Sequence, residues 1–403
     1  MKAKAISIIA ILSLFILSCG KDSSSSDEMK YSNPAGKDMP VMAWFTLYGP
    51  HLDASHFKDL SDAGFNLAFS FISDIEELDK VLDGAKGSGV KVIASCDEMK
   101  SDPQGTVRHL KKNRSVAAYF IKDEPFAKDL DTLANWFNQI LETDDSRLLY
   151  CNLNPTYCPG ELLGFDTYED YVSAYCEKID PLFLSFDHYP VLNTGLRPDF
   201  WYNLEVVSSE ARKRNIPFWG FALSTAHAIY PIATYESMGL QIWSNLAYGA
   251  QGIEYFTFLS SLDDKFHDGP IDSKGERTPV YQAVRRLNSE VQSLKDVFLG
   301  DEVAGVWHTG EHLPTGTSEL VTMPVGVNYI KSEDKGVLVS EIHNSKKVYL
   351  MVVNHDYESP QTVTIGFEKN FSMMFPTESS GKIRKGTHDF EILPGGMLLF
   401  RVK

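Results

Sequence analysis

VAAYFI at residues 116–121 runs directly into KDEPF at residues 122–126. The six apolar residues predict a buried β-strand, and Pro125 ends it because proline has no amide hydrogen to donate to a sheet. Asp123 and Glu124 therefore stand side by side at the carboxyl end of a buried strand. In (β/α)8 barrels the active site is built at this end of the strands, so the stretch predicts a positioned acid.

Seven further apolar runs and the amphipathic segments between them predict the rest of the fold. The runs occupy residues 41–45, 67–71, 90–95, 148–151, 182–186, 218–223 and 252–258. Helix-like patterns lie between them, at residues 54–63, 75–88, 130–142, 201–214 and 235–249. This alternation favours an α/β fold, a (β/α)8 TIM barrel over residues 39–299. An open doubly wound sheet would place a glycine-rich phosphate loop after its first strand, and YGPH at residues 48–51 is no such loop.

Residues 300–403 follow a different pattern. Short alternating segments with turn residues between them lie at residues 336–341, 347–353, 362–365 and 396–402. They predict a small C-terminal antiparallel β-sandwich. A structural appendage packed on the barrel is the favoured interpretation of this domain, and a sugar-binding module is the alternative.

The N-terminus predicts export and lipidation. A basic start and an apolar stretch lead to ILSCG at residues 16–20, which resembles a bacterial lipobox, so residues 1–19 are predicted to be a lipoprotein signal peptide with Cys19 as the lipidated residue. An ordinary cleaved signal or a short membrane helix are the alternatives. Residues 20–38 are polar and predict a disordered tether. We expect an outer-membrane lipoprotein exposed at the cell surface, or facing the periplasm, that meets the membrane through its lipid anchor only.

Composition argues against nucleic acid as a partner and against a bound metal or cofactor. The chain has 54 acidic and 38 basic residues and a formal net charge of -16, which repels nucleic acid. Besides Cys19 there are four cysteines, with no CxxC pair, so no metal site and no cofactor are predicted. One local disulfide between Cys151 and Cys158 in an oxidising compartment is the less favoured alternative to free thiols.

Polar residues end five neighbouring predicted strands and suggest a chemistry. Cleavage of a glycosidic bond requires one carboxylic acid that protonates the departing oxygen and a second carboxylate that acts at the anomeric carbon. Glu124 is the predicted acid, and a carbohydrate is the predicted substrate. Further residues at the strand ends, or with aromatic rings suited to stacking on sugars, are predicted to bind it: Asp123, Asn152, Asn154, His188, Tyr189, His227, Trp44 and Trp219.

These residues carry a family resemblance. Asp123-Glu124 at the end of strand 4 and His188-Tyr189 at the end of strand 6 resemble the clan A glycoside hydrolases. Residues 230–258 look like the passage from strand 7 to strand 8 of family 42 β-galactosidases and their relatives. The resemblance implies hydrolysis of a β-linked galactoside or glucoside, with Glu124 as general acid/base.

The sequence departs from the clan at the second carboxylate. Retaining members place a nucleophilic glutamate at the end of strand 7, and residues 218–227 contain no carboxylate. Asp187, Glu254 and Glu236 are the candidate replacements. Asp187 lies at a strand end and suits an inverting mechanism, whereas Glu254 sits early in its strand and Glu236 is placed to favour a helix dipole.

Other chemistries remain as alternatives. Lys122 beside the acids would suit a Schiff-base aldolase, and His188 and His227 with Asp187 would suit a metal site, although no compact ligand motif surrounds them. We therefore expect a surface-anchored glycoside hydrolase. The alternative is a catalytically silent carbohydrate-binding lipoprotein that has lost the strand 7 nucleophile.

Overall fold

The structure is a computed structural model, and it describes residues 30–46, 54–263, 265–376 and 381–403. The predicted signal peptide, the predicted lipidation site Cys19 and most of the predicted tether lie outside these residues. Within them, no helix is both long and apolar enough to cross a bilayer.

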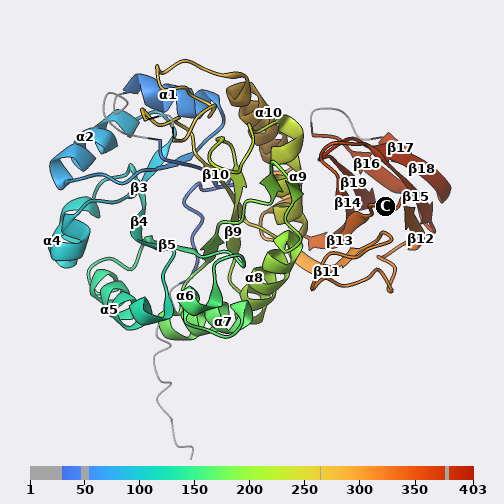
Figure 1. Cartoon of the computed structure of the whole chain (residues 1–403), viewed down its shortest axis with the longest axis horizontal. Coiled ribbons are helices and arrows are strands. Elements are labelled where there is room, and N and C mark those ends of the chain that lie inside the picture. The colour runs from blue at the N-terminus through green and yellow to red at the C-terminus, as the bar shows by residue number, and fades with distance from the viewer. Residues whose placement is uncertain (1–29, 47–53, 264, 377–380) are drawn as a thin grey trace, which may run out of the picture. The chain divides into compact units, whose positions relative to one another are not determined.

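Eight parallel strands form a closed barrel, which confirms the predicted fold class (Figure 1). Each predicted apolar run supplies one strand, because a parallel strand covered on both faces is apolar along its whole length. The strands, in their order around the barrel, are β1 (Val41–Trp44), β2 (Leu67–Phe69), β3 (Lys91–Ala94), β4 (Val116–Asp123), β5 (Leu148–Leu153), β6 (Leu184–Phe186), β9 (Phe218–Leu223) and β10 (Gly252–Phe256).

Helices surround the barrel (Figure 1). Several begin at a side-chain cap, as in α9, where the Thr234 side chain accepts from the backbone N–H of Ser237. A short hairpin of β7 (Val191–Leu192) and β8 (Gly195–Leu196) follows β6. The helices are α1 (Ala54–Asp62), α2 (Ile75–Ala85), α3 (Glu98–Ser101), α4 (Pro103–Leu110), η1 (Ala127–Asp129), α5 (Leu130–Leu141), α6 (Gly160–Leu163), α7 (Tyr168–Ile179), α8 (Phe200–Arg214), α9 (Tyr235–Ala247), α10 (Pro279–Ser293) and α11 (Lys295–Phe298).

Large rings fill the inside of the barrel. Trp44 packs against Phe69 with ring centroids 4.2 Å apart and against Phe221 at 5.5 Å. Tyr150 and Trp219 belong to the same buried cluster. The barrel is therefore a packed core, and only its carboxyl-end rim is available for chemistry.

The packed body begins before the predicted end of the tether. Trp219 Nε1 donates to the hydroxyl of Tyr31 at 3.3 Å, and Lys91 Nζ donates to the carbonyl of Pro34 at 2.8 Å. Tyr31 also packs against Phe183. Residues 31–38 thus contact the barrel, and the prediction of a disordered tether up to residue 38 is wrong for this part.

Two antiparallel sheets follow the barrel. One has the order β11-β13-β14-β19-β16-β17 and the other β12-β15-β18, and a buried apolar cluster joins their faces. This agrees with the predicted sandwich-like domain. The strands are β11 (Glu302–His308), β12 (Val327–Ser332), β13 (Val337–Asn344), β14 (Lys347–Asn354), β15 (Gln361–Phe367), β16 (Phe371–Met374), β17 (Gly381–Ile383), β18 (Gly386–Ile392) and β19 (Met397–Val402).

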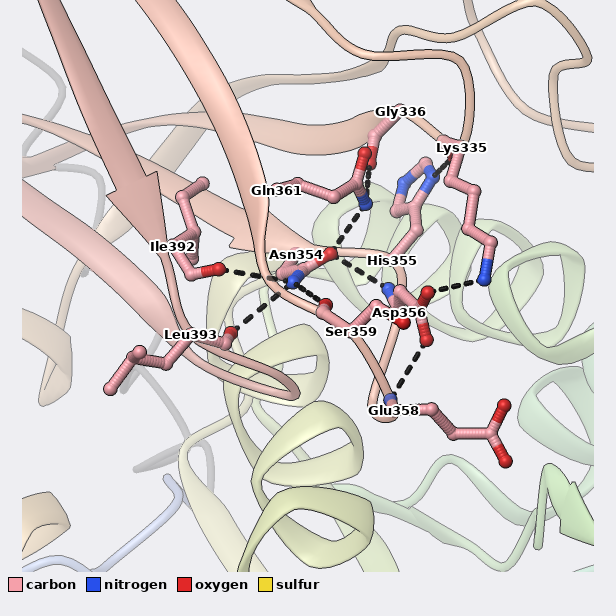
Figure 2. Close-up of polar contacts among 10 residues, drawn as sticks. All are labelled: Lys335, Gly336, Asn354, His355, Asp356, Glu358, Ser359, Gln361, Ile392 and Leu393. Carbon is pink, nitrogen blue, oxygen red and sulfur yellow. Dashed lines mark hydrogen bonds and ion pairs between the residues drawn. The ribbon is translucent and has the colours of Figure 1, made fainter.

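Asn354 at the end of β14 organises one edge of these sheets (Figure 2). Its Nδ2 donates to the backbone carbonyls of Ser359 at 2.9 Å and Leu393 at 3.2 Å, and its Oδ1 accepts from the backbone N–H of Asp356 at 2.8 Å. Gln361 donates to the same Oδ1 and to the carbonyl of Gly336. The two buried amides thereby fix the β14–β15 turn to the start of β13 and the end of β18.

The six-stranded sheet is joined to the barrel through α9 and α11. Ser340 Oγ in β13 donates to the carbonyl of Ala247 at 2.7 Å, and Asn344 Nδ2 donates to the carbonyls of Val297 and Leu299 at 3.0 and 2.9 Å. Leu338 and other apolar side chains of this sheet belong to the same buried cluster as the barrel helices.

Candidate active site

A β-bulge in β4 aims the acidic pair. The register of β4 on β5 shifts between Phe120 and Lys122, so Lys122 lies opposite Cys151 and Asp123 lies opposite Asn152. Cys151 packs in the cluster between the barrel and its helices, and side chains of register partners point to the same face of a sheet. Lys122 therefore points away from the barrel axis, and the next residue, Asp123, points toward it. An outward lysine does not suit the Schiff-base alternative.

Glu124 leaves the strand in a left-handed conformation, with φ of 48°. Such a backbone is costly for a residue with a side chain and is found at functional sites. Its N–H donates to the carbonyl of Asn152 at 2.8 Å. The carbonyl of the next residue, Pro125, accepts from Asn154 Nδ2 at 3.0 Å and from the Tyr171 hydroxyl at 2.9 Å. These bonds hold the turn that presents the Glu124 carboxyl.

Asn152 brings the carboxylates of two strands together. Its Nδ2 donates to Asp123 Oδ1 at 3.2 Å and to Asp187 Oδ1 at 2.8 Å, so these two oxygens are at most 6.0 Å apart. Asp187 follows β6 two residues after Ser185, which is the register partner of Asn152. The predicted meeting of Asp123, Asn152 and Asp187 at one edge is what the structure shows.

Burial and mutual repulsion raise the pKa values of this group. Burial, and then the charge of Asp123, raise the pKa of Glu124 to about 7. Burial, followed by the charges of Glu124 and Asp123, raises the pKa of Asp187 well above its usual range. Burial also raises the pKa of Asp123. Like charges close together in a poorly solvated site do not all ionise at neutral pH, so the group retains a proton there.

Glu254 does not face this site. It lies inside the barrel with no exposed surface, and its carboxyl contacts the Tyr150 hydroxyl at 2.6 Å and Ser185 Oγ at 2.8 Å. Burial raises its pKa to about 8, although both hydroxyl contacts oppose this shift. A substrate does not reach a group sealed in the core, so the prediction that Glu254 is a catalytic carboxylate is wrong. Glu236 lies in the first turn of α9, outside the group of carboxylates that Asn152 joins.

The two predicted stacking tryptophans are also core residues. Trp44 is 2% exposed and Trp219 is 1% exposed. Trp219 lies in the half of β9 nearer its start and contacts Tyr31. The prediction that Trp44 and Trp219 bind sugar is wrong, because an apolar run does not reveal which of its alternating residues point into the barrel.

Phenylalanines take the exposed positions instead. Phe45 and Phe71 follow β1 and β2, with ring centroids 5.7 Å apart, and Phe71 is 48% exposed. Phe256 and Phe266 are 5.3 Å apart and adjoin Phe45. His227, predicted to bind substrate, packs against Phe266 at 5.0 Å and is partly exposed. Sequence reasoning missed the phenylalanines; for Phe45 and Phe71, their place one or two residues after a strand end was the available signal.

The remaining predicted binding residues are buried supports. The His188 side chain has no exposed surface, its Nε2 lies 3.5 Å from Asp199 Oδ1, and burial lowers its pKa, so the ring is neutral. Asn154 holds Pro125, as described above. Tyr189 is 7% exposed and packs between Phe221 and Phe256. Direct substrate contact predicted for Asn154 and His188 is therefore wrong, and Tyr189 offers little surface for it.

Sequence reasoning missed a cluster of Arg197, Tyr157 and Tyr230. The Arg197 guanidinium lies 4.0 Å from the ring centre of Tyr157, and its Nη2 donates to the Tyr230 hydroxyl at 3.3 Å. Burial, and then the charge of Asp187, raise the pKa of Tyr157, which places the phenol near that carboxylate. The cluster adds hydrogen-bond donors and ring faces to the site.

The four cysteines of the described residues form no disulfide. Cys96, Cys151, Cys158 and Cys176 are free thiols, so Cys151 and Cys158 are not bridged. Among the described residues, no three His, Cys, Asp or Glu side chains are arranged to hold a metal ion.

The fold is similar to that of solved glycoside hydrolases. A family 39 glycoside hydrolase from the gut symbiont Bacteroides cellulosilyticus WH2 has 11% identity, with 93% of this chain and 82% of that chain covered and a TM-score of 0.56. An alpha-amylase from Geobacillus thermoleovorans, solved with acarbose, has 9% identity, with 91% and 98% covered and a TM-score of 0.56.

A GH27 β-L-arabinopyranosidase from Geobacillus stearothermophilus has 9% identity, with 92% of this chain and 97% of that chain covered and a TM-score of 0.52. Comparison by sequence finds no matching family model and no matching curated protein. At such low identities the likeness shows a shared fold: a (β/α)8 barrel with C-terminal antiparallel sheets.

Proposed function

We propose that the protein is a glycoside hydrolase in which Glu124 is the proton donor and Asp187 is the second catalytic carboxylate. The observation that carries this proposal is the group of carboxyls on β4 and β6, joined by one amide and with raised pKa values. Hydrolysis of a glycoside needs one protonated and one ionised carboxyl on either side of the anomeric carbon. Barrels with similar topology among solved glycoside hydrolases support the same proposal.

Burial raises the pKa of both Glu124 and Asp187, and the hydrogen bonds around them favour Glu124 as the group that keeps the proton. Asn152 donates a hydrogen bond to Asp187 and another to Asp123, which stabilises their ionised forms. No such side-chain donor reaches the Glu124 carboxyl among the residues described. Burial, and then the neighbouring charge of Asp123, raise the pKa of Glu124 to about 7, so the carboxyl is partly protonated at neutral pH. Glu124 is half-buried and so more exposed than Asp187, which suits a group that must reach the departing oxygen.

The proposed substrate is a β-linked galactoside or glucoside. This specificity rests on the resemblance of residues 230–258 to family 42 β-galactosidases, a stretch that begins at Tyr230, the hydrogen-bond partner of Arg197. Rings such as Phe45 and Phe71 would offer apolar faces to the sugar.

A screen of nitrophenyl β-glycosides and β-glucans tests the proposal. Wild-type protein and Glu124→Gln are compared, with Glu236→Gln as a matched control because that carboxyl lies on α9. We expect turnover of the β-glucans that Glu124→Gln abolishes, a smaller loss on the nitrophenyl glycosides, and turnover of both that Glu236→Gln retains. Nuclear magnetic resonance of the first-formed anomer would then report whether the configuration is retained or inverted.

The second candidate is a catalytically silent carbohydrate-binding protein. It is favoured by the end of β9, where Ser224 and Thr225 stand at the position that a nucleophilic glutamate takes in the clan the sequence resembles. Calorimetric titration with the same sugars distinguishes the two. Binding without turnover in both wild type and Glu124→Gln would support the silent protein and exclude the enzyme.

The proposed location is the outer membrane, at the cell surface, with Cys19 carrying the lipid. Radiolabelled palmitate incorporated by wild type and not by Cys19→Ala would support this. Protease treatment of intact cells would distinguish the surface from the periplasmic face.

A further inference from the structure

Beneath the acidic group, a chain of buried polar atoms crosses the barrel. Ser185 Oγ lies 3.0 Å from Asn152 Oδ1, 2.8 Å from Glu254 Oε2 and 2.8 Å from the Tyr150 hydroxyl. The Tyr150 hydroxyl lies 2.6 Å from Glu254 Oε1. All four residues are at most 2% exposed. Such a buried network is stable only when every donor and acceptor is satisfied, so its hydrogens can be counted.

The count starts at Asn152. Its amide nitrogen donates both hydrogens, one to Asp123 and one to Asp187, so its Oδ1 can only accept. The single hydrogen of Ser185 must then point to Asn152 Oδ1. The reverse amide orientation would set Oδ1 against two carboxylate oxygens. Ser185 is thereby committed as a donor toward Asn152 and has no hydrogen left for Glu254.

The count ends at Glu254. The single Tyr150 hydrogen satisfies Glu254 Oε1. If Glu254 were ionised, its Oε2 would face the Ser185 oxygen at 2.8 Å with no hydrogen between them. A proton on Oε2 resolves this, because Glu254 then donates to Ser185, which donates to Asn152. Burial acts in the same direction by raising the pKa of Glu254 to about 8.

We infer that Glu254 is a positioning residue: as a neutral carboxylic acid it acts through Ser185 to hold the Asn152 amide with both hydrogens on Asp123 and Asp187. The catalytic importance of this role rests on the proposed function, since the Asn152 amide stabilises the ionised Asp187 that hydrolysis needs. The proton assignment itself rests on the contacts: an ionised Glu254 leaves two of the four oxygen contacts without a hydrogen, and a protonated Glu254 leaves only the one between Ser185 and Tyr150.

The proton assignment is tested without turnover. Infrared difference spectra of wild type and Glu254→Gln at pH 7, with carbon-13-labelled glutamate, report whether the lost carboxyl was protonated. We expect a protonated-acid carbonyl band that Glu254→Gln removes. An ionised-carboxylate band in its place would overturn the inference, whether or not any glycoside is cleaved.

The positioning role is tested by variants of the chain. Glutamine keeps a donor for Ser185, so Glu254→Gln should retain the wild-type pH profile of kcat/KM. Ser185→Ala leaves Asn152 Oδ1 without its donor and should lower kcat/KM roughly 10-fold and raise the pKa of Asp187, measured by nuclear magnetic resonance. Tyr150→Phe is the control, because it leaves the line from Glu254 through Ser185 intact and should leave the pKa of Asp187 unmoved.

Two results would contradict the positioning role. One is an unchanged Asp187 titration in a folded Ser185→Ala protein. The other is a Glu254→Gln protein that is folded and has lost the wild-type Asp187 titration. If wild type turns over no glycoside, the proposed function fails, but the infrared spectra and the Asp187 titration still decide this inference.

Discussion

Lowering the pH from 8 to 5 should weaken the contact between the barrel and the C-terminal sheets through two buried histidines. His355 Nδ1 lies 3.1 Å from the Lys335 carbonyl, so this nitrogen carries the hydrogen (Figure 2). His355 Nε2 lies 2.9 Å from His308 Nδ1, and His308 Nε2 lies 2.9 Å from the Tyr248 hydroxyl at the end of α9. Trp201 of α8 covers the His355 ring, with centroids 4.5 Å apart. The pair thus links both parts of the fold while neutral.

The magnitude follows from the pKa values. Burial lowers the pKa of His355 from 6.5 to about 4, against the opposing effect of the Lys335 carbonyl. The folded protein therefore binds fewer protons than the unfolded chain, and stability is complete above pH 6.5 and is lost as the pH falls toward 4. At pH 5 the His355 ring is largely protonated in the unfolded chain and largely neutral in the folded protein. This difference lowers the free energy of unfolding by about 2 kcal/mol relative to pH 8. Burial lowers the pKa of His308 well below its usual range and adds to the effect.

Urea denaturation followed by circular dichroism at pH 8 and pH 5 measures this loss. Buried carboxyls with raised pKa values, such as Glu254 and Glu205 beside Tyr248, change stability in the opposite direction, so wild type must be compared with a variant. His355→Gln removes the titrating ring, and the pH-dependent loss in this variant should be about 2 kcal/mol smaller than in wild type. An equal loss in both proteins would refute the reasoning.

Three further predictions concern the acidic group, the barrel interior and the C-terminal sheets. If the Glu124 proton is needed for turnover, kcat/KM should fall as the pH rises through about 7. Asp123→Asn removes a charge that raises the pKa of Glu124, so it should move this fall in kcat/KM to lower pH. A pH profile that Asp123→Asn leaves unmoved would contradict the role of Asp123. Trp44→Ala should lower the free energy of unfolding by roughly 3–5 kcal/mol, since the ring fills the barrel. A variant that keeps full stability and loses sugar affinity would show that Trp44 binds substrate. Asn354→Ala should lower the free energy of unfolding, measured with denaturant, by about 1–3 kcal/mol, because buried carbonyls lose their donor. Asn370→Ala serves as a control at an exposed asparagine.

Much of the fold could be predicted because buried parallel strands are apolar along their length. All eight barrel strands fell within or close to the apolar runs, and the acidic pair fell at the end of β4. The meeting of Asp123, Asn152 and Asp187 followed from the rule that carboxyl ends of parallel strands share one edge.

Side-chain direction could not be predicted in the same way. A strand that is apolar on both faces does not reveal which residues point inward, so Trp44 and Trp219 were assigned to the site although they fill the core. The bulge near Lys122 reverses the alternation in β4, and one extra residue leaves no sequence signal that we recognised. Tyr31 was placed in a tether because its partner, Trp219, is remote in the sequence.

The central claim is that Glu124 supplies a proton to a departing sugar oxygen. The most direct measurement compares kcat for wild type and Glu124→Gln on an unactivated β-linked disaccharide and on the matching nitrophenyl glycoside. We predict a loss of about 100-fold to 10,000-fold on the disaccharide and a smaller loss on the nitrophenyl glycoside, whose leaving group needs less protonation. A Glu124→Gln protein that cleaves the disaccharide as fast as wild type would contradict the account.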